Sequence, residues 1–345
     1  MKKLSFKRIF GLFFLLLIFT LTMVSVFEGE NFKQVWALIC TADLGYTLPA
    51  IACVIFFILG ESAIFHYLLR ILGARASFFH CSLYSFIGFF YSCITPSASG
   101  GQPMQAIAMR KDNIPIAVSS VVLAIVTITY KLVLVVVGAA VMIIRPEKMM
   151  VYLDPVAPII YTGLALNIVC VLVLLFIVFS PSLVRCILSW FLSLAHKIKP
   201  SLNFSKLSAR LDKMIGQYQG ASDFFLNNPH VIVHVFLITF LQRVLLFLIT
   251  WLVYRALSLA AHSVTLITGL QTMISAAVDM LPLPGGMGAS ENLFMEIFEP
   301  IFGEELVLPG MMLSRGISYY TQVLISGVMT VAANFILRKK RSNSP

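Results

Sequence analysis

Three basic residues lie inside segments that are otherwise apolar, and their side chains are suited to binding an anion. Lys131, Arg243 and Arg315 each occur within a hydrophobic run long enough to cross a bilayer. A charged side chain at the centre of such a helix costs about 2.5–3.5 kcal/mol on insertion scales, so each one requires a partner or a function. Each also shares its helix face with serine, threonine, glutamine or tyrosine residues, among them Tyr319 beside Arg315. These polar stripes predict that the cations face a polar interior.

Three acidic residues occupy comparable positions and leave two interpretations open. Glu61, Asp279 and Glu291 are also set in or beside apolar runs. They can neutralise the bases in buried pairs such as Glu61–Lys131 or Asp279–Arg243. Alternatively, the cations converge on a ligand, because guanidinium and ammonium groups bind phosphate through charge-assisted hydrogen bonds. We favour an anion site for the set as a whole, with the phosphate of a lipid as its natural ligand.

Two apolar runs are interrupted by helix-breaking residues. The first interruption covers Thr95–Pro103 and the second covers Leu281–Glu291, and both combine prolines with a Gly-Gly pair. Proline lacks the backbone donor and glycine costs a helix about 1 kcal/mol, so neither run continues as a helix. In hydrocarbon, broken backbone is tolerated only where protein buries it or where it lines a watery cavity. Interruptions in corresponding parts of two halves are typical of a transporter binding site.

The residues at the two interruptions complete the candidate binding site. We expect the hydroxyls of Ser97 and Ser99 to cap the returning helix, and the two tips to approach one another near the middle of the bilayer. The glycines are expected to serve as tight turns, close approaches or hinges. The candidate residues at the interruptions, in addition to Asp279 and Glu291, are Thr95, Ser97, Ser99, Gly100, Gly101, Gln102, Gly285 and Gly286.

Composition predicts an all-α polytopic membrane protein. The 345 residues are 59% hydrophobic and 12% charged, with a mean hydropathy of +0.93, which is too apolar for a soluble globule. Segments of about 20 apolar residues span a bilayer. Such runs occur near 9–27, 45–69, 114–144, 156–179, 231–254 and 313–337. Two further runs near 77–94 and 264–281 are followed by short returns at 98–109 and 288–298, which predicts two re-entrant hairpins.

The distribution of charge predicts the orientation. With six spans and two hairpins, most lysines and arginines lie on one side, which the positive-inside rule makes cytoplasmic. Both termini and an interfacial loop at 181–229 are then cytoplasmic in a cell membrane, while Glu28 and Glu304 lie outside. The element order at 1–150 repeats at 151–345 from the opposite face, as an inverted-topology repeat within a single domain. The net charge of +10 therefore orients the chain and does not indicate nucleic acid.

Other chemistry is not indicated by the sequence. The cysteines and histidines lack metal-ligand spacing, and the chain has no Walker motif, so neither a metal nor another cofactor is predicted. Ser97 and Ser99 lack a His/Asp grouping that would make either a nucleophile. The head group, the energy source and any self-association are left open.

The broken stretches resemble those of a known family. Thr95–Pro103, Pro284–Glu291 and the cluster from Ser314 to Tyr320 are similar to the lysylphosphatidylglycerol synthase transmembrane-region family, the flippase-like domain of the bacterial multiple peptide resistance factor. The resemblance covers essentially the whole chain. It implies movement of an aminoacylated phospholipid, such as lysylphosphatidylglycerol, between leaflets, which protects bacteria from cationic antimicrobial peptides. The family's synthase domain is not in this sequence, so the resemblance implies a separate aminoacyl- or glycosyl-transferase as partner.

Alternative functions remain open at this stage. Undecaprenyl-pyrophosphate phosphatases also combine inverted repeats with re-entrant hairpins, but they carry an acidic cluster and an arginine where this chain has Gln102 and Met287 to Ala289. A transporter of a glycolipid or a polyprenyl-linked sugar is a further alternative. A scaffold that anchors a lipid synthase without transport is another, although it would not need buried cations. We therefore expect a transporter rather than an enzyme.

Overall fold

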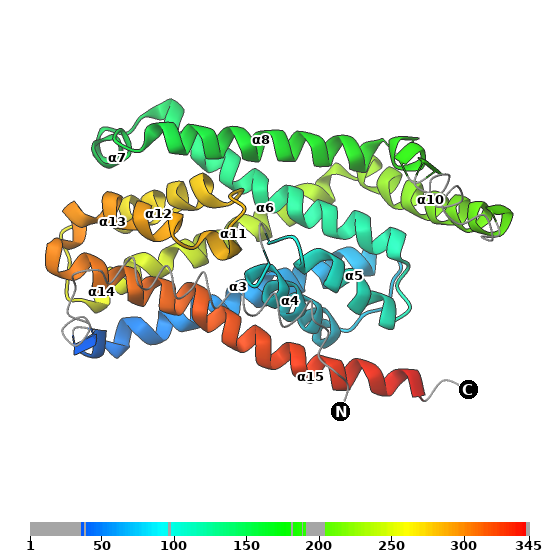
Figure 1. The fold of residues 1–345 in the computed structure, drawn as a ribbon, viewed down its shortest axis with the longest axis horizontal. Helices are drawn as coiled ribbons and strands as arrows, with labels where there is room; N and C mark the ends of the chain where they lie inside the picture. The colour runs from blue at the N-terminus through cyan, green and yellow to red at the C-terminus, as the bar shows by residue number, and fades with distance from the viewer. Residues whose placement is uncertain are drawn as a thin grey trace.

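Every named element of the structure is helical. A computed structural model describes residues 36–37, 39–95, 98–180, 182–187, 189–190 and 204–342. The predicted first span at 9–27 and Ser97 lie outside these ranges. The elements, shown in Figure 1, are α3 (Leu44–Ile71), α4 (Phe78–Cys93), α5 (Gly101–Lys111), α6 (Ile116–Ile144), α7 (Glu147–Leu153), α8 (Ala157–Phe179), α10 (Phe204–Asn227), α11 (Pro229–Ala256), α12 (Val264–Val278), the short turn η2 (Pro284–Gly286), α13 (Ala289–Phe302), α14 (Glu304–Arg315), the π-helical turn η3 (Gly316–Thr321) and α15 (Gln322–Ser342).

Five segments of the described chain are long and apolar enough to cross a membrane. They are α3, α6, α8, α11 and the continuous run Glu304–Leu337. The first four agree with the predicted spans at 45–69, 114–144, 156–179 and 231–254. The last begins at Glu304 and not near 313, because α14, η3 and α15 follow one another without a break. Glu304 and Glu305 lie in the first turn of α14, where acidic side chains complement the helix dipole, so these charges begin the helix and do not form a loop.

The two broken runs form helical hairpins. The predicted first hairpin at 77–94 and 98–109 is α4 followed by α5, and the two helices contact each other closely. The predicted second hairpin at 264–281 and 288–298 is α12 followed by α13, which continues to Phe302. A serine caps the first helix of each hairpin, because Ser77 Oγ accepts from His80 N and Ser263 Oγ accepts from Leu266 N, both at 3.3 Å.

The hairpins come from opposite ends of the helix bundle. The backbone N–H of Asp43, the N-cap of α3, donates to Ala256 O at the end of α11 at 2.9 Å, so these two helix ends lie together. We call this the Asp43 end and the opposite one the Ile71 end. Helix α4 follows Ile71, whereas α12 follows Ala256. Figure 1 accordingly shows α4 and α5 in one half of the molecule and α12 and α13 in the other.

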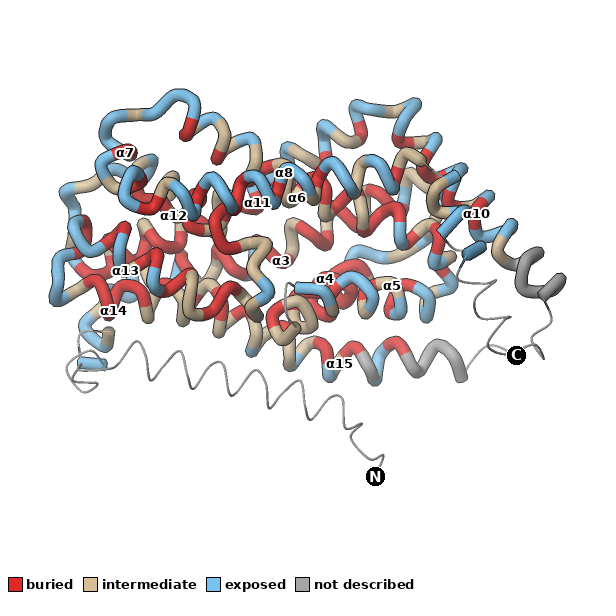
Figure 2. The backbone as a smooth tube through the Cα atoms, turned by 45° about the horizontal axis from the view of Figure 1, so that its top comes forward, coloured by how far each residue is buried: buried red, intermediate tan, exposed pale blue. Residues whose placement is uncertain are grey.

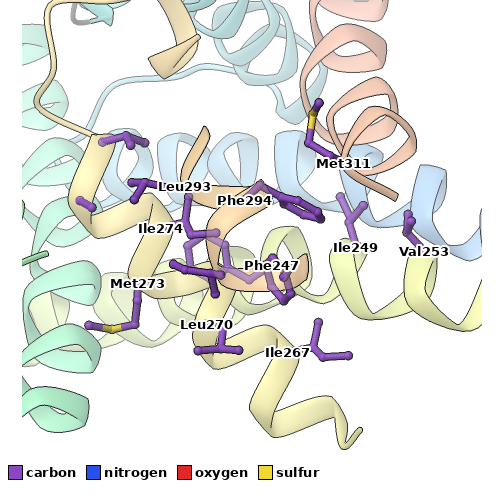
Figure 3. Packing of buried hydrophobic residues seen from close by; sticks show 14 of the residues in the cluster. Phe247, Ile249, Val253, Ile267, Leu270, Met273, Ile274, Leu293, Phe294 and Met311 are labelled. Carbon is purple, nitrogen blue, oxygen red and sulfur yellow. The ribbon is translucent and has the colours of Figure 1, made fainter. Parts of the chain in front are cut away.

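Two regions of buried apolar side chains hold the bundle together. At the Asp43 end, α11, α12, α13 and α14 pack through residues such as Phe247, Ile274, Phe294 and Met311, as Figure 3 shows. At the Ile71 end, α3, α4, α6 and α11 bury a second cluster that includes Leu68, Tyr84 and Val122. Figure 2 shows exposed positions along α8 and α15. Leucine, valine and phenylalanine are among the exposed residues of both helices, as expected where hydrocarbon replaces water.

The polar interval at 181–229 contains a long amphipathic helix, α10. It begins at Phe204 and packs against α6, α8 and α11 near the Ile71 end. Tyr218 donates its hydroxyl to Ile177 O at 3.0 Å and Ser222 donates to Val178 O at 2.6 Å. Two side chains of α10 thus satisfy backbone carbonyls in the last turn of α8 and hold the two helices together. Residues 191–203 of the interval lie outside the described residues.

Candidate functional site

The first interruption is stabilised by Thr95, whereas the predicted capping residue Ser97 lies outside the described residues. Thr95 Oγ1 donates to Tyr91 O at 2.6 Å and accepts from Gly100 N at 2.9 Å, which spans the gap between α4 and α5. Gly100 is the N-cap of α5 and no side chain caps it, so the expectation that Ser99 caps this helix is wrong. Ser99 is exposed instead, and the Thr95 hydroxyl accepts from the backbone N–H of Gly100.

Gly101 allows the two helices of the first hairpin to approach closely. A Cβ atom at Gly101 would lie 2.7 Å from Gly88 O and would overlap the Ser92 hydroxyl. Gln105, one turn later, fills the space that a side chain at Gly88 would occupy, and its Nε2 donates to Glu61 Oε1 at 2.8 Å. Glu61 is therefore hydrogen-bonded to the returning helix of the hairpin, and the suggested Glu61–Lys131 pair is not formed.

The second interruption is a sequence of left-handed glycines that ends in a carboxylate cap. Gly285, Gly286 and Gly288 have φ values of +60°, +67° and +84°, which non-glycine residues rarely adopt. Glu291 Oε2 accepts from Gly288 N at 2.7 Å and so caps the start of α13. Its side chain is 1% exposed. Glu291 thus fixes the returning helix by the same kind of contact that Thr95 provides in the first hairpin.

Arg315 fixes the second interruption from the following helix. Its Nε donates to Glu291 Oε1 at 2.8 Å, and its Nη2 donates to Gly285 O at 2.9 Å. The guanidinium therefore holds both the cap and the turn of the second tip. Directly after Arg315, the helix widens into the π-helical turn Gly316–Thr321, an irregularity that often marks functional positions.

Tyr319 in this π-helical turn joins the two interruptions. Its hydroxyl donates to Cys93 O, the last residue of α4, at 2.9 Å. Its ring lies against Gly285, where an added Cβ would come within 2.6 Å of the ring carbon Cζ. Cys93, Met287 and Tyr319 form one buried cluster. The two hairpin tips therefore meet in this structure, as the sequence led us to expect, and Tyr319 packs between them.

Lys131 is paired with the residue that ends α12. Lys131 Nζ donates to Asp279 Oδ2 at 2.6 Å and also contacts Met280 Sδ at 2.9 Å. The side chains are 14% and 19% exposed, so the pair is largely shielded from solvent. This pair replaces the suggested Asp279–Arg243 pair, since the Asp279 carboxylate binds the Lys131 ammonium. It links the middle of α6 to the start of the second interruption.

Arg243 has no ion pair among the described residues. Its guanidinium carbon lies 3.9 Å from the ring centroid of Tyr130 and 5.1 Å from that of Phe247. The residue is 4% exposed, and its Nε and Nη2 are buried without a hydrogen-bond partner in the described part of the chain. Tyr130 is within electrostatic reach of Arg243, Asp279 and Glu61. Arg243 thus contacts an aromatic ring that is itself within electrostatic reach of two carboxylates.

The remaining candidate residues lie around these groups. Gln102 is exposed at the start of α5, and its Nε2 donates to Thr127 Oγ1 on α6. Gly100 approaches Thr95, and Gly286 approaches Val278. The structure therefore gathers Thr95, Gly100, Gly285, Glu291, Arg315 and Tyr319 at the meeting tips, and Glu61, Lys131, Arg243 and Asp279 nearby in the bundle. Sequence reasoning missed Tyr130, Gln105 and Cys93, although Tyr130 directly precedes Lys131 and Gln105 follows Gln102 by one helical turn.

Comparison with known proteins identifies the family. The family described as "Lysylphosphatidylglycerol synthase TM region" matches residues 8–326, which is most of the chain, and the chain belongs to this family. With its several long apolar helices it is a multi-pass membrane protein. No match was found among curated proteins.

Proposed function

We propose that this member of the lysylphosphatidylglycerol synthase transmembrane-region family moves a phospholipid between bilayer leaflets, with Arg243 as the principal contact for the lipid phosphate. Membership of the family supports a lipid-related role in the membrane. The observation that carries the proposal is the buried Arg243, which has two guanidinium nitrogens without partners among the described residues. Burial of an unsatisfied charged donor is costly, so a ligand that accepts these hydrogen bonds is favoured.

The chemistry of Arg243 fits a phosphate better than a neutral ligand. The planar guanidinium presents paired donors that match two oxygens of a phosphate. The guanidinium carbon lies over the Tyr130 ring, 3.9 Å from its centroid, whereas Nε and Nη2 have no partner among the described residues. We propose that these two nitrogens bind the ligand. In this state Lys131 forms an ion pair with Asp279 at 2.6 Å, and Arg315 forms one with Glu291 at 2.8 Å. We propose that Lys131 turns to the phosphate when the hairpins separate, while Arg315 keeps the second tip folded.

The arrangement of the hairpins supports alternating access to this site. We propose that the re-entrant hairpins α4–α5 and α12–α13 belong to two inverted halves, 1–150 and 151–345, and that their tips form the floor and the roof of a head-group cavity. In the described state Tyr319 closes the contact between the tips. Separation of one hairpin at a time would expose Arg243 to one leaflet and then to the other. The cavity opens sideways, so that acyl chains stay in hydrocarbon.

The family name and the charges near Arg243 support a proposal for the lipid and for the direction of its movement. We propose an aminoacylated phospholipid such as lysylphosphatidylglycerol, delivered by a separate lipid aminoacyl-transferase and moved to the outer leaflet of a bacterial cell membrane, which confers resistance to antimicrobial peptides. The Asp279 and Glu61 side chains, within electrostatic reach of the Tyr130 ring that Arg243 contacts, would complement the lysyl ammonium of such a head group. A glycolipid lacks that second charge, which makes it the less suitable substrate.

Translocation in proteoliposomes tests the proposal. The purified full chain is reconstituted with lysylphosphatidylglycerol carrying a fluorescent acyl chain, and an impermeant quencher reports lipid in the outer leaflet. We expect protein-dependent exchange that falls at least tenfold in Arg243→Met, because the phosphate loses two charge-assisted bonds of about 1.5 kcal/mol or more each. Arg255→Met is the matched control: Arg255 lies on the same helix and stacks on Tyr46 at 5.4 Å, away from the hairpin tips.

The same preparation separates the alternative functions. Exchange equal to that of protein-free liposomes would overturn the proposal and favour a scaffold. Release of inorganic phosphate from a polyprenyl pyrophosphate would favour a lipid phosphatase. Faster exchange of unmodified phosphatidylglycerol than of the lysyl lipid would retain transport but contradict the aminoacylated substrate.

A further inference from the structure

An open pocket lies at the Ile71 end of the bundle, apart from Arg243 and the hairpin tips. It has a volume of about 550 Å³ and is lined by His66 and Arg70 of α3 and by the loop from Gly73 to Ser77. This loop leads into the first hairpin. None of these residues belongs to the candidate site described above, so the pocket requires its own explanation.

The loop that forms the pocket wall is held in place by specific hydrogen bonds. His66 Nδ1 donates to Ala76 O at 3.1 Å, and Ala74 N donates to Leu69 O at 2.8 Å. Gly73 takes a left-handed conformation with φ +75°, which permits the turn. Ser77 then caps α4 through its bond from His80 N at 3.3 Å. The pocket is therefore shaped by the fold before any ligand binds, which lowers the entropic cost of binding.

The charged groups at the pocket are basic. Arg70 and Arg75 are both exposed, and neither forms an ion pair within the described ranges. The neighbouring acid Asp112 is occupied, since its Oδ2 contacts His80 Nδ1 at 2.5 Å and accepts the Tyr84 hydroxyl. Two arginines on a preformed concave wall, beside the capped start of the sixteen-residue helix α4, favour an anion with several acceptor oxygens.

We propose that this pocket binds a phosphate group, held by Arg70 and Arg75 at the start of the first hairpin. A phospholipid head group and a soluble phosphate compound share this chemistry. The equivalent position before the second hairpin also has a pocket, of about 420 Å³, but Lys148 is its only lysine or arginine among the lining residues. The two arginines therefore distinguish the Ile71 end. Binding here does not require that the protein translocate lipid.

Native mass spectrometry of the full chain in detergent tests this proposal. Phosphatidylglycerol is titrated in, with a diacylglycerol of the same acyl chains as the phosphate-free reference. We expect wild type to bind one phosphatidylglycerol about tenfold more tightly than the double variant Arg70→Gln, Arg75→Gln, since arginine–phosphate bonds are charge-assisted. The matched control, Arg110→Gln with Lys213→Gln, removes the same charge from exposed positions outside the pocket and is expected to bind as wild type does.

Competition with inorganic phosphate identifies the source of the ligand. Displacement of phosphatidylglycerol by millimolar phosphate assigns the pocket to a soluble phosphate compound, whereas retention assigns it to a lipid head group. Equal binding by wild type and the double variant would overturn the proposal, as would equal weakening in the matched control, which would show general attraction between charges. Melting temperatures establish that the variants are folded. If the double variant does not fold, Arg75→Gln alone, in the exposed loop, supplies the comparison.

Discussion

The hydroxyl of Tyr319 donates a hydrogen bond to Cys93 O at 2.9 Å, across a sequence separation of 226 residues. Tyr319 lies in the π-helical turn after Arg315, and Cys93 ends the first helix of the other hairpin. The bond satisfies one of the backbone carbonyls that have no hydrogen-bond partner within the helix at its C-terminal end. A single side chain thereby connects the two interruptions, and any separation of the tips must break this bond.

Tyr319→Phe is expected to weaken the contact between the tips without disturbing the packing of the ring. Loss of the bond costs about 1 kcal/mol, which corresponds to about a fivefold larger population of separated tips. The measurement is the rate at which a maleimide modifies Cys93, which is 8% exposed, in a variant whose other cysteines are replaced by alanine. The rate should rise about fivefold.

Tyr218→Phe provides the matched control for that experiment. Tyr218 also donates to a helix-end carbonyl, Ile177 O at 3.0 Å, but lies on α10 away from the tips. Its removal should lower stability by a similar amount and leave the Cys93 rate unchanged. An increase of the same size in both variants would show that global opening, and not separation of the tips, exposes Cys93.

Glu291 is expected to be essential for the second tip because one carboxylate serves two partners. Glu291→Gln replaces the ionised acceptor for Arg315 Nε and weakens the cap on Gly288 N, at 2.8 and 2.7 Å. Removing one member of a buried pair costs up to about 3–5 kcal/mol. Glu296→Gln, at an exposed position on the same helix, should change the melting temperature little. Equal melting temperatures for both variants would contradict a structural role for Glu291.

Helix periodicity and breaking residues predicted most of the fold. The predicted spans at 45–69 and 156–179 correspond to α3 and α8, which are continuous apolar runs. The caps of these helices are Asp43 and Leu72 for α3, and Val156 and Ser180 for α8. The start of the last span could not be predicted in the same way. Glu304, Glu305 and Pro309 suggest a loop in isolation, and only their position in the first turns of α14 makes them compatible with a helix.

The candidate site was predicted in its members but not in its pairings. Polar residues in apolar runs are evident from composition, which is why Lys131, Arg243 and Arg315 were found. Partner choice depends on which way each helix faces its neighbour, so Lys131 pairs with Asp279 and Glu61 bonds to Gln105. The stacking of Arg243 on Tyr130 could not be predicted either, because an aromatic residue in a span is usually assigned to packing.

The orientation of the chain predicts which ends accept an impermeant reagent. Arg70, Arg75, Arg110 and Lys213 lie at the Ile71 end, whereas Glu299, Glu304 and Glu305 lie at the Asp43 end. The positive-inside rule then makes the Ile71 end cytoplasmic. In intact cells, a cysteine at Glu304 should react and cysteines at Lys206 or Lys213 should not. Reaction at Lys206 or Lys213 would contradict both the orientation and the inverted repeat.

The Lys131–Asp279 pair is expected to have separate effects on stability and transport, which a double-mutant cycle can resolve. Lys131→Met leaves Asp279 largely buried without its cation, and Asp279→Asn leaves Lys131 without its anion. Each single variant should therefore lose up to about 3–5 kcal/mol of stability. The double variant should regain most of it, because neither charge is then stranded. Melting temperatures measure this coupling, and lipid exchange in proteoliposomes is measured on the same samples.

The rate of lipid exchange by the double variant shows whether the Lys131–Asp279 pair has a role in transport in addition to its role in stability. If Lys131 turns to the phosphate when the hairpins separate, the double variant will regain most of its stability but will exchange lipid slowly. Both the Lys131 ammonium, proposed to bind the phosphate, and the Asp279 carboxylate, proposed to complement the lysyl group, are then missing. The 2.6 Å bond to Asp279 would then keep the Lys131 ammonium away from the phosphate while the hairpin tips are in contact. If lipid exchange returns together with stability, the pair is purely structural and Arg243 acts alone on the phosphate. A double variant that is no more stable than either single variant would show that the two charges are not coupled. That result would contradict the stabilising interaction expected from the short distance between them.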